Sequence, residues 1–187
     1  MKKSKKKQTK KNLSKKATAS KAKPKLLKKT SSAKKVTRQI TPVTTINPYL
    51  TFNGNCEEAF NFYKSVFGGN FNRLSRFRDI PPMEGQEMSE DLKERIMHVS
   101  LPISKETFLM GSDSNPMMGE VTVGQHLSLS VNTGSKNEAN RIFKLLSAGG
   151  QITMPIADMF WGSYFGMLSD KFGIVWMVNS DQSSKSQ

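Results

Sequence analysis

The sequence predicts an α+β fold built from two similar βαβββ modules. A heptapeptide at 58–64 recurs eighty positions later at 138–144, with Glu, Ala and Lys at the same places in both copies. Each copy follows a short apolar strand and precedes a Gly-Gly pair. Two matching modules in one chain usually pack about a pseudo-two-fold axis, and the concave surface where they meet is a natural ligand site.

The first module is expected over 45–112 and opens with a strand at 46–53. Its even-numbered positions are apolar and its odd-numbered positions are mixed, which is typical of a half-buried strand. A helix is expected to follow, with Asn55 and Glu58 forming a capping box and Gly68-Gly69 ending it. Further strands are expected at 71–78, 95–103 and 107–112, and a long mobile loop at 79–94.

The second module is expected over 125–180. Polar and apolar residues alternate over 126–131, so the polar face of this strand is expected to line a cavity and its apolar face to pack on a helix. Ser135 and Glu138 predict a second capping box. The remaining strands are expected near 150–154, 160–168 and 173–180.

Charge separates the chain into a tail and a domain. Of the 29 Lys and Arg residues, 17 fall between Lys2 and Arg38, where there is no Asp or Glu. Such a segment cannot bury enough apolar surface to offset its ordering entropy, and its like charges repel. We therefore expect residues 1–44 to be a disordered Lys-rich tail, 45–182 to be the folded domain, and 183–187 to be a disordered C-terminus.

The tail has two interpretations, both left open. Lysines neutralise phosphates by releasing counterions, which gives salt-sensitive affinity for nucleic acid without sequence preference. Alternatively, the tail only solubilises or localises the protein, although a mitochondrial transit peptide is disfavoured because Lys outnumbers Arg. No stretch predicts a signal peptide or a membrane span. The lysines that would contact phosphates are Lys5, Lys6, Lys7, Lys10, Lys11, Lys15, Lys16, Lys28, Lys29, Lys34 and Lys35.

Cys56 is the only cysteine, which excludes an intramolecular disulfide and makes a reducing cytoplasm the expected location. Its place after Asn55 at a helix start would let the helix dipole lower the pKa of the thiol. The interpretation that we favour is a small apolar residue packed in the first turn.

Several short motifs occur in a characteristic order. They are Asn47-Pro48-Tyr49-Leu50, Phe62-Tyr63, Val66-Phe67-Gly68-Gly69, Pro81-Pro82-Met83, His98, Trp161-Gly162, Asp170-Lys171-Phe172-Gly173 and Trp176. Together they resemble the PhnB-like branch of the vicinal oxygen chelate superfamily, which has the glyoxalase/bleomycin-resistance/dioxygenase fold. The resemblance covers roughly residues 45 to 180. It implies paired βαβββ modules whose eight strands curl into an open, glyoxalase-like cup.

Metal-using members of that superfamily place one ligand on the first strand and another on the last strand of each module. The resemblance carries these positions to Asn47, Met110, His126 and Met177, of which only His126 is a good ligand for hard or borderline cations. His98 could join His126 as a replacement, but two histidines without a carboxylate fall short of the usual ligand sets. We therefore predict neither a metal nor a cofactor.

The leading hypothesis is a metal-independent small-molecule-binding protein, with catalysis left open. The alternatives are a metal-dependent lyase or dioxygenase using His98 and His126, and a nucleic-acid-associated protein that acts through its tail. Methyltransferase chemistry is disfavoured because no Gly-x-Gly-x-Gly follows a strand. A homodimer is expected, because pairing subunits covers exposed sheet edges and apolar rims.

An aromatic-lined cavity is the expected ligand site. The candidate ligand-binding residues are Tyr49, His98, His126, Trp161 and Tyr164, while strand parity places Trp176 in the core. Methionines could make the cavity wall adaptable, although about half of the eleven should be core. Those considered for the wall are Met110, Met117, Met118, Met154, Met159 and Met167.

Overall fold

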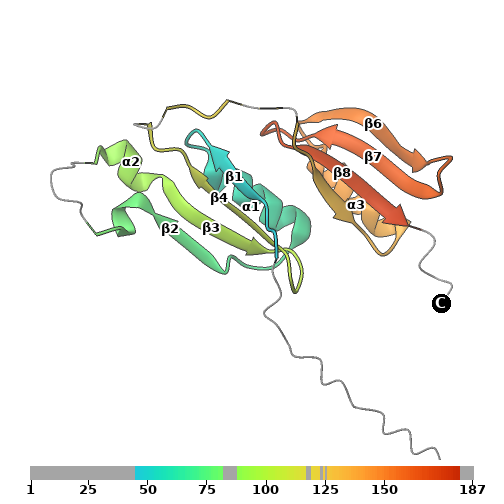
Figure 1. The fold of residues 1–187 in the computed structure, drawn as a ribbon, viewed down its shortest axis with the longest axis horizontal. Coiled ribbons are helices and arrows are strands. Elements are labelled where there is room, and N and C mark those ends of the chain that lie inside the picture. The colour runs from blue at the N-terminus through green and yellow to red at the C-terminus, as the bar shows by residue number, and fades with distance from the viewer. Residues whose placement is uncertain (1–44, 82–87, 117–118, 123, 125, 182–187) are drawn as a thin grey trace, which may run out of the picture. The chain divides into compact units, whose positions relative to one another are not determined.

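Two four-stranded sheets dominate the computed structural model, and a helix packs on one face of each (Figure 1). The structure describes residues 45–81, 88–116, 119–122, 124 and 126–181. The predicted basic tail, residues 82–87 of the predicted loop, and the C-terminal residues 183–187 lie outside the described residues. The described residues belong to a single compact unit.

The first sheet has the strand order β1-β4-β3-β2. Strand β1 runs parallel to β4, and the other neighbours are antiparallel. Helix α1 contacts β3 and β4. The elements are β1 (Tyr49–Phe52), α1 (Cys56–Phe67), β2 (Arg73–Arg76), β3 (Ile96–Pro102) and β4 (Phe108–Asp113).

The second sheet repeats this plan in the order β5-β8-β7-β6, again with the first and last strands parallel. Helix α3 contacts β7 and β8. The prediction of two βαβββ modules is therefore confirmed. The elements are β5 (Leu129–Asn132), α3 (Lys136–Leu146), β6 (Gln151–Asp158), β7 (Ser163–Ser169) and β8 (Val175–Asp181).

The predicted loop at 79–94 is only partly a loop. It begins within a short 3-10 helix, η1 (Phe77–Asp79), and ends in α2 (Glu90–Glu94). The Ser89 side chain accepts a hydrogen bond from the Leu92 amide, and Leu92 is buried. Glu90 and Asp91, which fall in the predicted loop, therefore form the first turn of a short capped helix, where carboxylates are favoured.

The two predicted capping boxes differ in outcome. Asn55 makes no side-chain cap bond at the start of α1. Asp113 of β4 accepts the amide N–H of Gly54 and of Cys56 instead, each at 2.9 Å. The first prediction is thus wrong, because a buried carboxylate from another strand satisfies these donors. At α3, Ser135 accepts the Glu138 amide at 3.3 Å, which is one half of the predicted box, while the Glu138 carboxylate accepts hydrogen bonds from Arg141.

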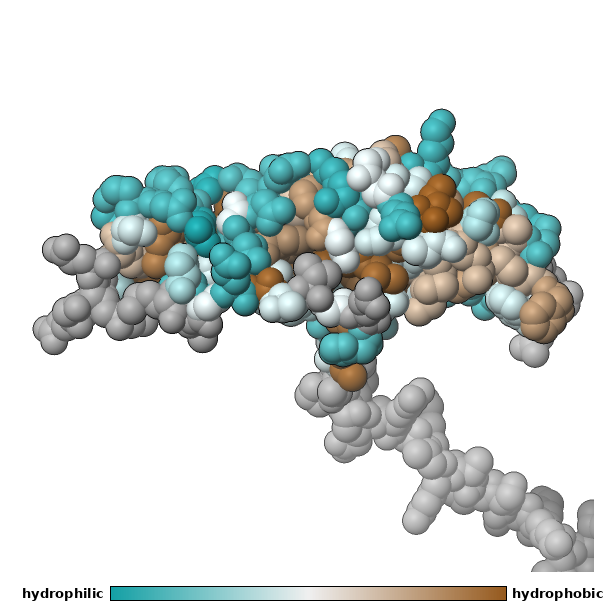
Figure 2. All heavy atoms as spheres, turned by 90° about the horizontal axis from the view of Figure 1, so that it is seen from above, coloured by the Kyte–Doolittle hydropathy of each residue, from teal (hydrophilic) through white to brown (hydrophobic). Residues whose placement is uncertain are grey.

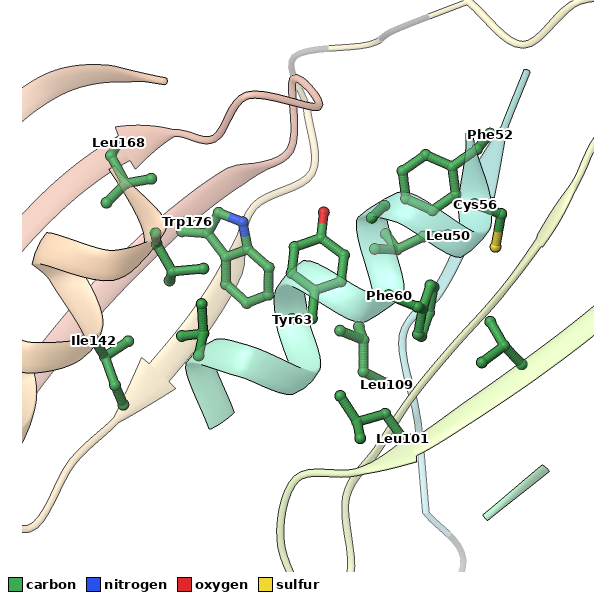
Figure 3. Packing of buried hydrophobic residues seen from close by; sticks show 14 of the residues in the cluster. Leu50, Phe52, Cys56, Phe60, Tyr63, Leu101, Leu109, Ile142, Leu168 and Trp176 are labelled. Carbon is green, nitrogen blue, oxygen red and sulfur yellow. The ribbon is translucent and has the colours of Figure 1, made fainter. Parts of the chain in front are cut away.

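The core lies between the helices and the sheets (Figure 3). Helix α1 buries Ala59, Phe60, Tyr63 and Val66 on one stripe. Gly111 of β4 lies against this stripe, and a Cβ there would come within 2.6 Å of the Phe60 ring. Close approach between helix and sheet therefore depends on that glycine.

The two modules are joined through a buried carboxylate. Asp170, between β7 and β8, accepts hydrogen bonds from the Tyr63 hydroxyl of α1 at 2.9 Å and from the Trp176 indole N–H at 2.8 Å. The backbone amides of Phe172 and Ile174 complete its shell. Figure 3 shows the Trp176 and Tyr63 rings side by side, and Trp176 is buried, as its strand parity predicted.

Cys56 is fully buried in the first turn of α1. Burial, together with the nearby charges of Asp113 and Glu57, raises the pKa of its thiol well above the ordinary value. The packing interpretation is confirmed. The suggestion of an acidified thiol is wrong, because desolvation outweighs the helix dipole at this position.

Within the described residues, no helix combines the length and the hydropathy that crossing a membrane would require.

Candidate functional site

Each sheet has one face packed on its helix and one face that carries no helix, which we call its open face. On the first sheet, residues of the open face alternate with buried residues such as Leu50, Val99 and Gly111. The open face is polar for the most part. It consists of Tyr49, Thr51, Arg73, Ser75, His98, Ser100, Met110 and Ser112.

The strand register brings two predicted site residues together on this face. The Tyr49 hydroxyl lies 3.4 Å from His98 Nδ1, and the two ring centroids are 5.8 Å apart. Ser75 lies opposite His98 on β2, and Thr51 lies opposite Ser112 on β1. We call Thr51, Ser112, His98 and Ser75 the polar row, since Thr51 pairs with Ser112 and Ser75 pairs with His98 on this face.

The first open face carries no carboxylate among the described residues. Arg73 lies on it, opposite Ser100, and forms no ion pair with a described residue. The nearby acid Asp113 points to the helix-covered side, where it binds three backbone amides, including that of Ile96. The face therefore offers one guanidinium, one imidazole and several hydroxyls, a set suited to anionic or neutral oxygen atoms.

The open face of the second sheet has a different chemistry. Ser130, Met177, Met167 and Met154 lie opposite one another on β5, β8, β7 and β6, and we call the three methionines the methionine row. Phe165 lies on the same face, and the ring of Trp161 packs against it at 6.1 Å. On the side of the molecule that Figure 2 draws, apolar residues are exposed among hydrophilic ones.

Tyr164 lies on the other side of the second sheet. Its hydroxyl donates to Asn140 Oδ1 of α3 at 2.9 Å, and the Lys136 ammonium lies over its ring. The structure thus places Tyr164 against the helix, whereas Trp161, its predicted neighbour in the site, is half exposed at the turn between β6 and β7.

His126 precedes β5 and is exposed, because the strand begins at Leu129 rather than at 126. It lines a cavity of about 570 Å³ together with Thr51, Asn53 and Phe172. Within the described residues, no hydrogen bond or ring contact joins it to His98.

A second cavity, of about 660 Å³, lies between β1 and β5. This volume suits a small organic molecule. Tyr49 from the first open face and Ser130 from the second both line it, and so do residues that pack against the core, such as Phe67 and Val131. Other lining residues are Leu109, Leu127, Asn132 and Trp176.

The side chains at the four positions where metal-using superfamily members carry ligands do not fit a divalent metal. Asn47 uses its side-chain oxygen to accept the Phe108 amide at 2.8 Å, while Met110 and Met177 supply only thioethers. In the described part of the chain, no three His, Cys, Asp or Glu side chains gather as a ligand cluster. The residues present thus disagree with a chelating metal centre.

Comparison with known proteins places the chain in a family. The profile of the 3-demethylubiquinone-9 3-methyltransferase family matches residues 44–179. Protein YjdN of Escherichia coli K12 is 30% identical over 141 residues, which cover 72% of this chain and 93% of YjdN. The chain belongs to this family, the PhnB-like branch of the vicinal oxygen chelate superfamily, and has the open glyoxalase-like fold that the resemblance implied.

Two solved structures are similar over nearly their whole length. Protein PA1353 from Pseudomonas aeruginosa is 40% identical with a TM-score of 0.66, and the match covers 74% of this chain and 98% of PA1353. A PhnB protein from Bacillus cereus is 27% identical with a TM-score of 0.58, and the match covers 73% of this chain and 99% of that protein.

Sequence reasoning named Tyr49 and His98, which lie on the first open face, but did not name Phe165 or Arg73 as candidates. The signal was available in the strand parity, because Arg73 and Ser75 share a face, as do Phe165 and Met167. What the sequence alone did not show was which face of each strand the helix covers.

Proposed function

We propose that this protein binds a small molecule on the open faces of its two sheets, without a metal. The observation that carries the proposal is the Tyr49–His98 pair, which lies on a hydroxyl-rich, carboxylate-free face beside a cavity of about 660 Å³. His98 Nε2 makes no hydrogen bond to a described residue, so it remains free for a ligand oxygen.

Binding is favoured over turnover because of the groups on the surface. A general base needs a carboxylate or an imidazole beside the proton it removes, and a nucleophile needs an activating partner. The first open face has one imidazole, whose Nδ1 faces the Tyr49 hydroxyl, and no carboxylate among the described residues. These groups orient and recognise a ligand, and catalysis is not part of the proposal.

The test is a thermal-shift and calorimetric screen of small carboxylates, phosphonates and neutral aromatics against the full-length protein. For any ligand found, His98→Ala should weaken binding about tenfold, the effect of losing one hydrogen bond to an anion. His126→Ala is the matched control and should change affinity less than about twofold. EDTA should leave both the melting temperature and the affinity unchanged.

Two outcomes would contradict the proposal. One is a broad panel without any ligand that stabilises the wild-type protein. The other is stoichiometric zinc, nickel, iron or manganese that is lost in His126→Ala, since this would favour the metal-dependent alternative.

We further propose a cytoplasmic homodimer. Strands β2 and β6 are the outer edges of their sheets, and unpaired edges are commonly covered by another subunit. Ile152 and Phe160, on or just after β6, are 49% and 97% exposed, which is unusual for such large apolar side chains. The domain boundaries at 45 and 182, and nucleic-acid binding by the tail, likewise remain proposals.

A further inference from the structure

We infer that the part of the ligand held in the cavity between β1 and β5 is uncharged, and that it combines an apolar body with an amide group bonded to the unpaired edges of both strands. This inference rests on the proposed function and names the chemical class that the cavity would take.

The cavity has an uncharged lining. Among the described residues, no Asp, Glu, Lys, Arg or His side chain lines its volume of about 660 Å³. A carboxylate or an ammonium group that entered this space would lose its hydration without gaining an ion-pair partner, which is costly. A neutral group is therefore favoured inside the cavity.

Much of the lining is apolar surface that the core leaves partly uncovered. Four apolar side chains pack against the core but are only half-buried, and they line the cavity beside the buried ring of Trp176. Those four are Phe67, Ile103, Leu129 and Val131. Removal of apolar surface from water contributes about 25 cal/mol per Å². The apolar body of a ligand would cover this surface and fill the gap between the two modules.

The free edge of β1 has unpaired backbone groups. Within the described residues, β1 pairs only with β4. Met110 donates its amide N–H to the Pro48 carbonyl, and Ser114 donates its own to the Phe52 carbonyl, so the even-numbered residues here bond to β4. In a parallel pair, the alternate residues direct both N–H and C=O away from the partner strand. Tyr49 is such a residue, and it lines the cavity.

Strand β5 presents a similar edge. In the described part of the chain it pairs only with β8, and the Thr133 amide donates to the Asn179 carbonyl. The odd-numbered residues therefore bond to β8, whereas Ser130 directs its N–H and C=O away from it. Few Cα atoms of β1 and β5 lie within 8 Å of one another, and no ladder of hydrogen bonds joins these two described strands. Both edges thus border the cavity without pairing to each other.

A trans amide matches two such edges, because its N–H and its C=O point in opposite directions. Neighbouring strands in a sheet are about 4.8 Å apart, so one amide between two strands needs edges roughly 10 Å apart. The carbonyl of the ligand accepts the N–H of Ser130, which is accessible because this residue is small and exposed. The N–H of the ligand donates to the carbonyl of Tyr49.

The experiment compares three probes that share a naphthalene ring, N-methyl-2-naphthamide, methyl 2-naphthoate and 2-naphthoate. The ester differs from the amide in lacking the N–H, and the third probe carries a negative charge. In NMR titrations of the full-length protein, the amide should bind about tenfold more tightly than the ester, which cannot donate to Tyr49. The anion should bind at least about tenfold more weakly than the amide.

Substitutions at Ser130 test the other hydrogen bond. Proline has no N–H, and an edge position tolerates it where that N–H makes no sheet hydrogen bond. Ser130→Pro should therefore weaken the amide and the ester by about tenfold each. Ser130→Ala is the matched control, since it keeps the N–H, and should stay within about twofold for both probes.

Hydrogen exchange of the wild-type protein supplies a measurement that needs no variant. Saturating N-methyl-2-naphthamide should slow exchange of the Ser130 amide at least about fivefold, because the amide then has a hydrogen-bond partner. Thr51 is also directed away from β4 by its place in the strand, but it does not line this cavity. Its exchange rate should stay within about twofold.

Equal affinity for the amide and the ester, or equal effects of Ser130→Pro and Ser130→Ala, would overturn the inference. If Ser130→Pro does not fold, an unchanged exchange rate at Ser130 overturns it instead. If the amide fails to bind while another molecule of the screen binds and is sensitive to His98→Ala, the ligand class is wrong and the proposed function stands. If no molecule binds, the proposed function itself fails.

Discussion

Buried polar atoms determine much of the local structure at the scale of single residues. Asp113 starts α1 and fixes the beginning of β3, although it lies 57 residues after Cys56 along the chain. Asp170 satisfies four donors at once. In the described residues, no buried side-chain nitrogen or oxygen lacks a hydrogen-bond partner. Substitutions at these carboxylates would therefore leave several desolvated donors unpaired.

The buried thiol of Cys56 predicts a loss of stability at alkaline pH. Its ordinary pKa is 9.0, and burial raises the pKa in the folded protein. Above pH 9 the unfolded chain loses this proton while the folded chain keeps it, so unfolding becomes more favourable by about 1.4 kcal/mol per pH unit. Urea unfolding at pH 8 and pH 10 should show a larger decrease for the wild type than for Cys56→Ala.

The thiol also gives an independent check. In the native protein at pH 8 it should react with a disulfide reagent far more slowly than in guanidinium chloride. Fast reaction in the native state, or equal decreases for the two proteins between pH 8 and pH 10, would contradict the burial argument.

Sequence reasoning was most accurate where the burial of a residue follows from the alternation of polar and apolar residues along its own strand. The alternation along their strands predicted a core position for Trp176 and an apolar face that includes Leu50 and Phe52, and all three residues are buried. It failed at Asn55, because the competing acceptor Asp113 comes from a strand far along the chain. Local patterns cannot reveal such a partner before the topology is known.

The boundaries of helices and strands were also predicted less well than their existence, because local patterns alone do not determine them. The repeat, the glycine pairs and the alternation predicted both modules and their helices, whereas α2 was missed because its five residues carry only one buried side chain, Leu92. The strand predicted from 126 begins at 129, so alternation alone extended it too far. The same limits affect the candidate site. His126 and Tyr164 were assigned to it from the sequence pattern, before it was known where the strand begins and which face of the sheet the helix covers.

The contact between α1 and the turn before β8 predicts a large effect of Asp170→Asn. The amide would bring N–H groups to a site where Asp170 now accepts four hydrogen bonds, and we expect about 3 kcal/mol of lost stability. Tyr63→Phe removes a single hydrogen bond and should cost about 1 kcal/mol. Urea unfolding followed by Trp176 emission measures both.

Asp181→Asn is the matched control, because Asp181 is exposed and bonded only to side chains of its own sheet. If Asp170→Asn were no more destabilising than this control, the junction would not hold the modules together as described.

At the scale of the whole molecule, the charge separation predicts that the tail and the domain act independently. All of the net positive charge lies before residue 45, because the rest of the chain has more acidic than basic residues. Deleting residues 1–40 should abolish nucleic-acid binding that otherwise weakens by orders of magnitude between about 50 and 200 mM salt. The truncated protein should keep its fold, its ligand affinity and its dimeric state in sedimentation experiments.

A truncated domain that still bound nucleic acid with the same salt dependence would contradict this division. Arg73, Arg76 and Arg78 would then be the basic residues to examine, although Arg76 and Arg78 are already paired with Glu57 and Glu94. A monomer at micromolar concentration would remove the dimer from the proposal.

The junction at Asp170 also constrains how the protein is made. On the ribosome the first module emerges before the second, and its α1 carries Tyr63 and Phe67, whose rings contact Trp176 of the last strand. During translation of the intervening residues, these rings and the Tyr63 hydroxyl have no native cover. The first module therefore completes its packing only when the last strand leaves the exit tunnel, which makes late synthesis the step at which newly made chains are most exposed to chaperones and to one another.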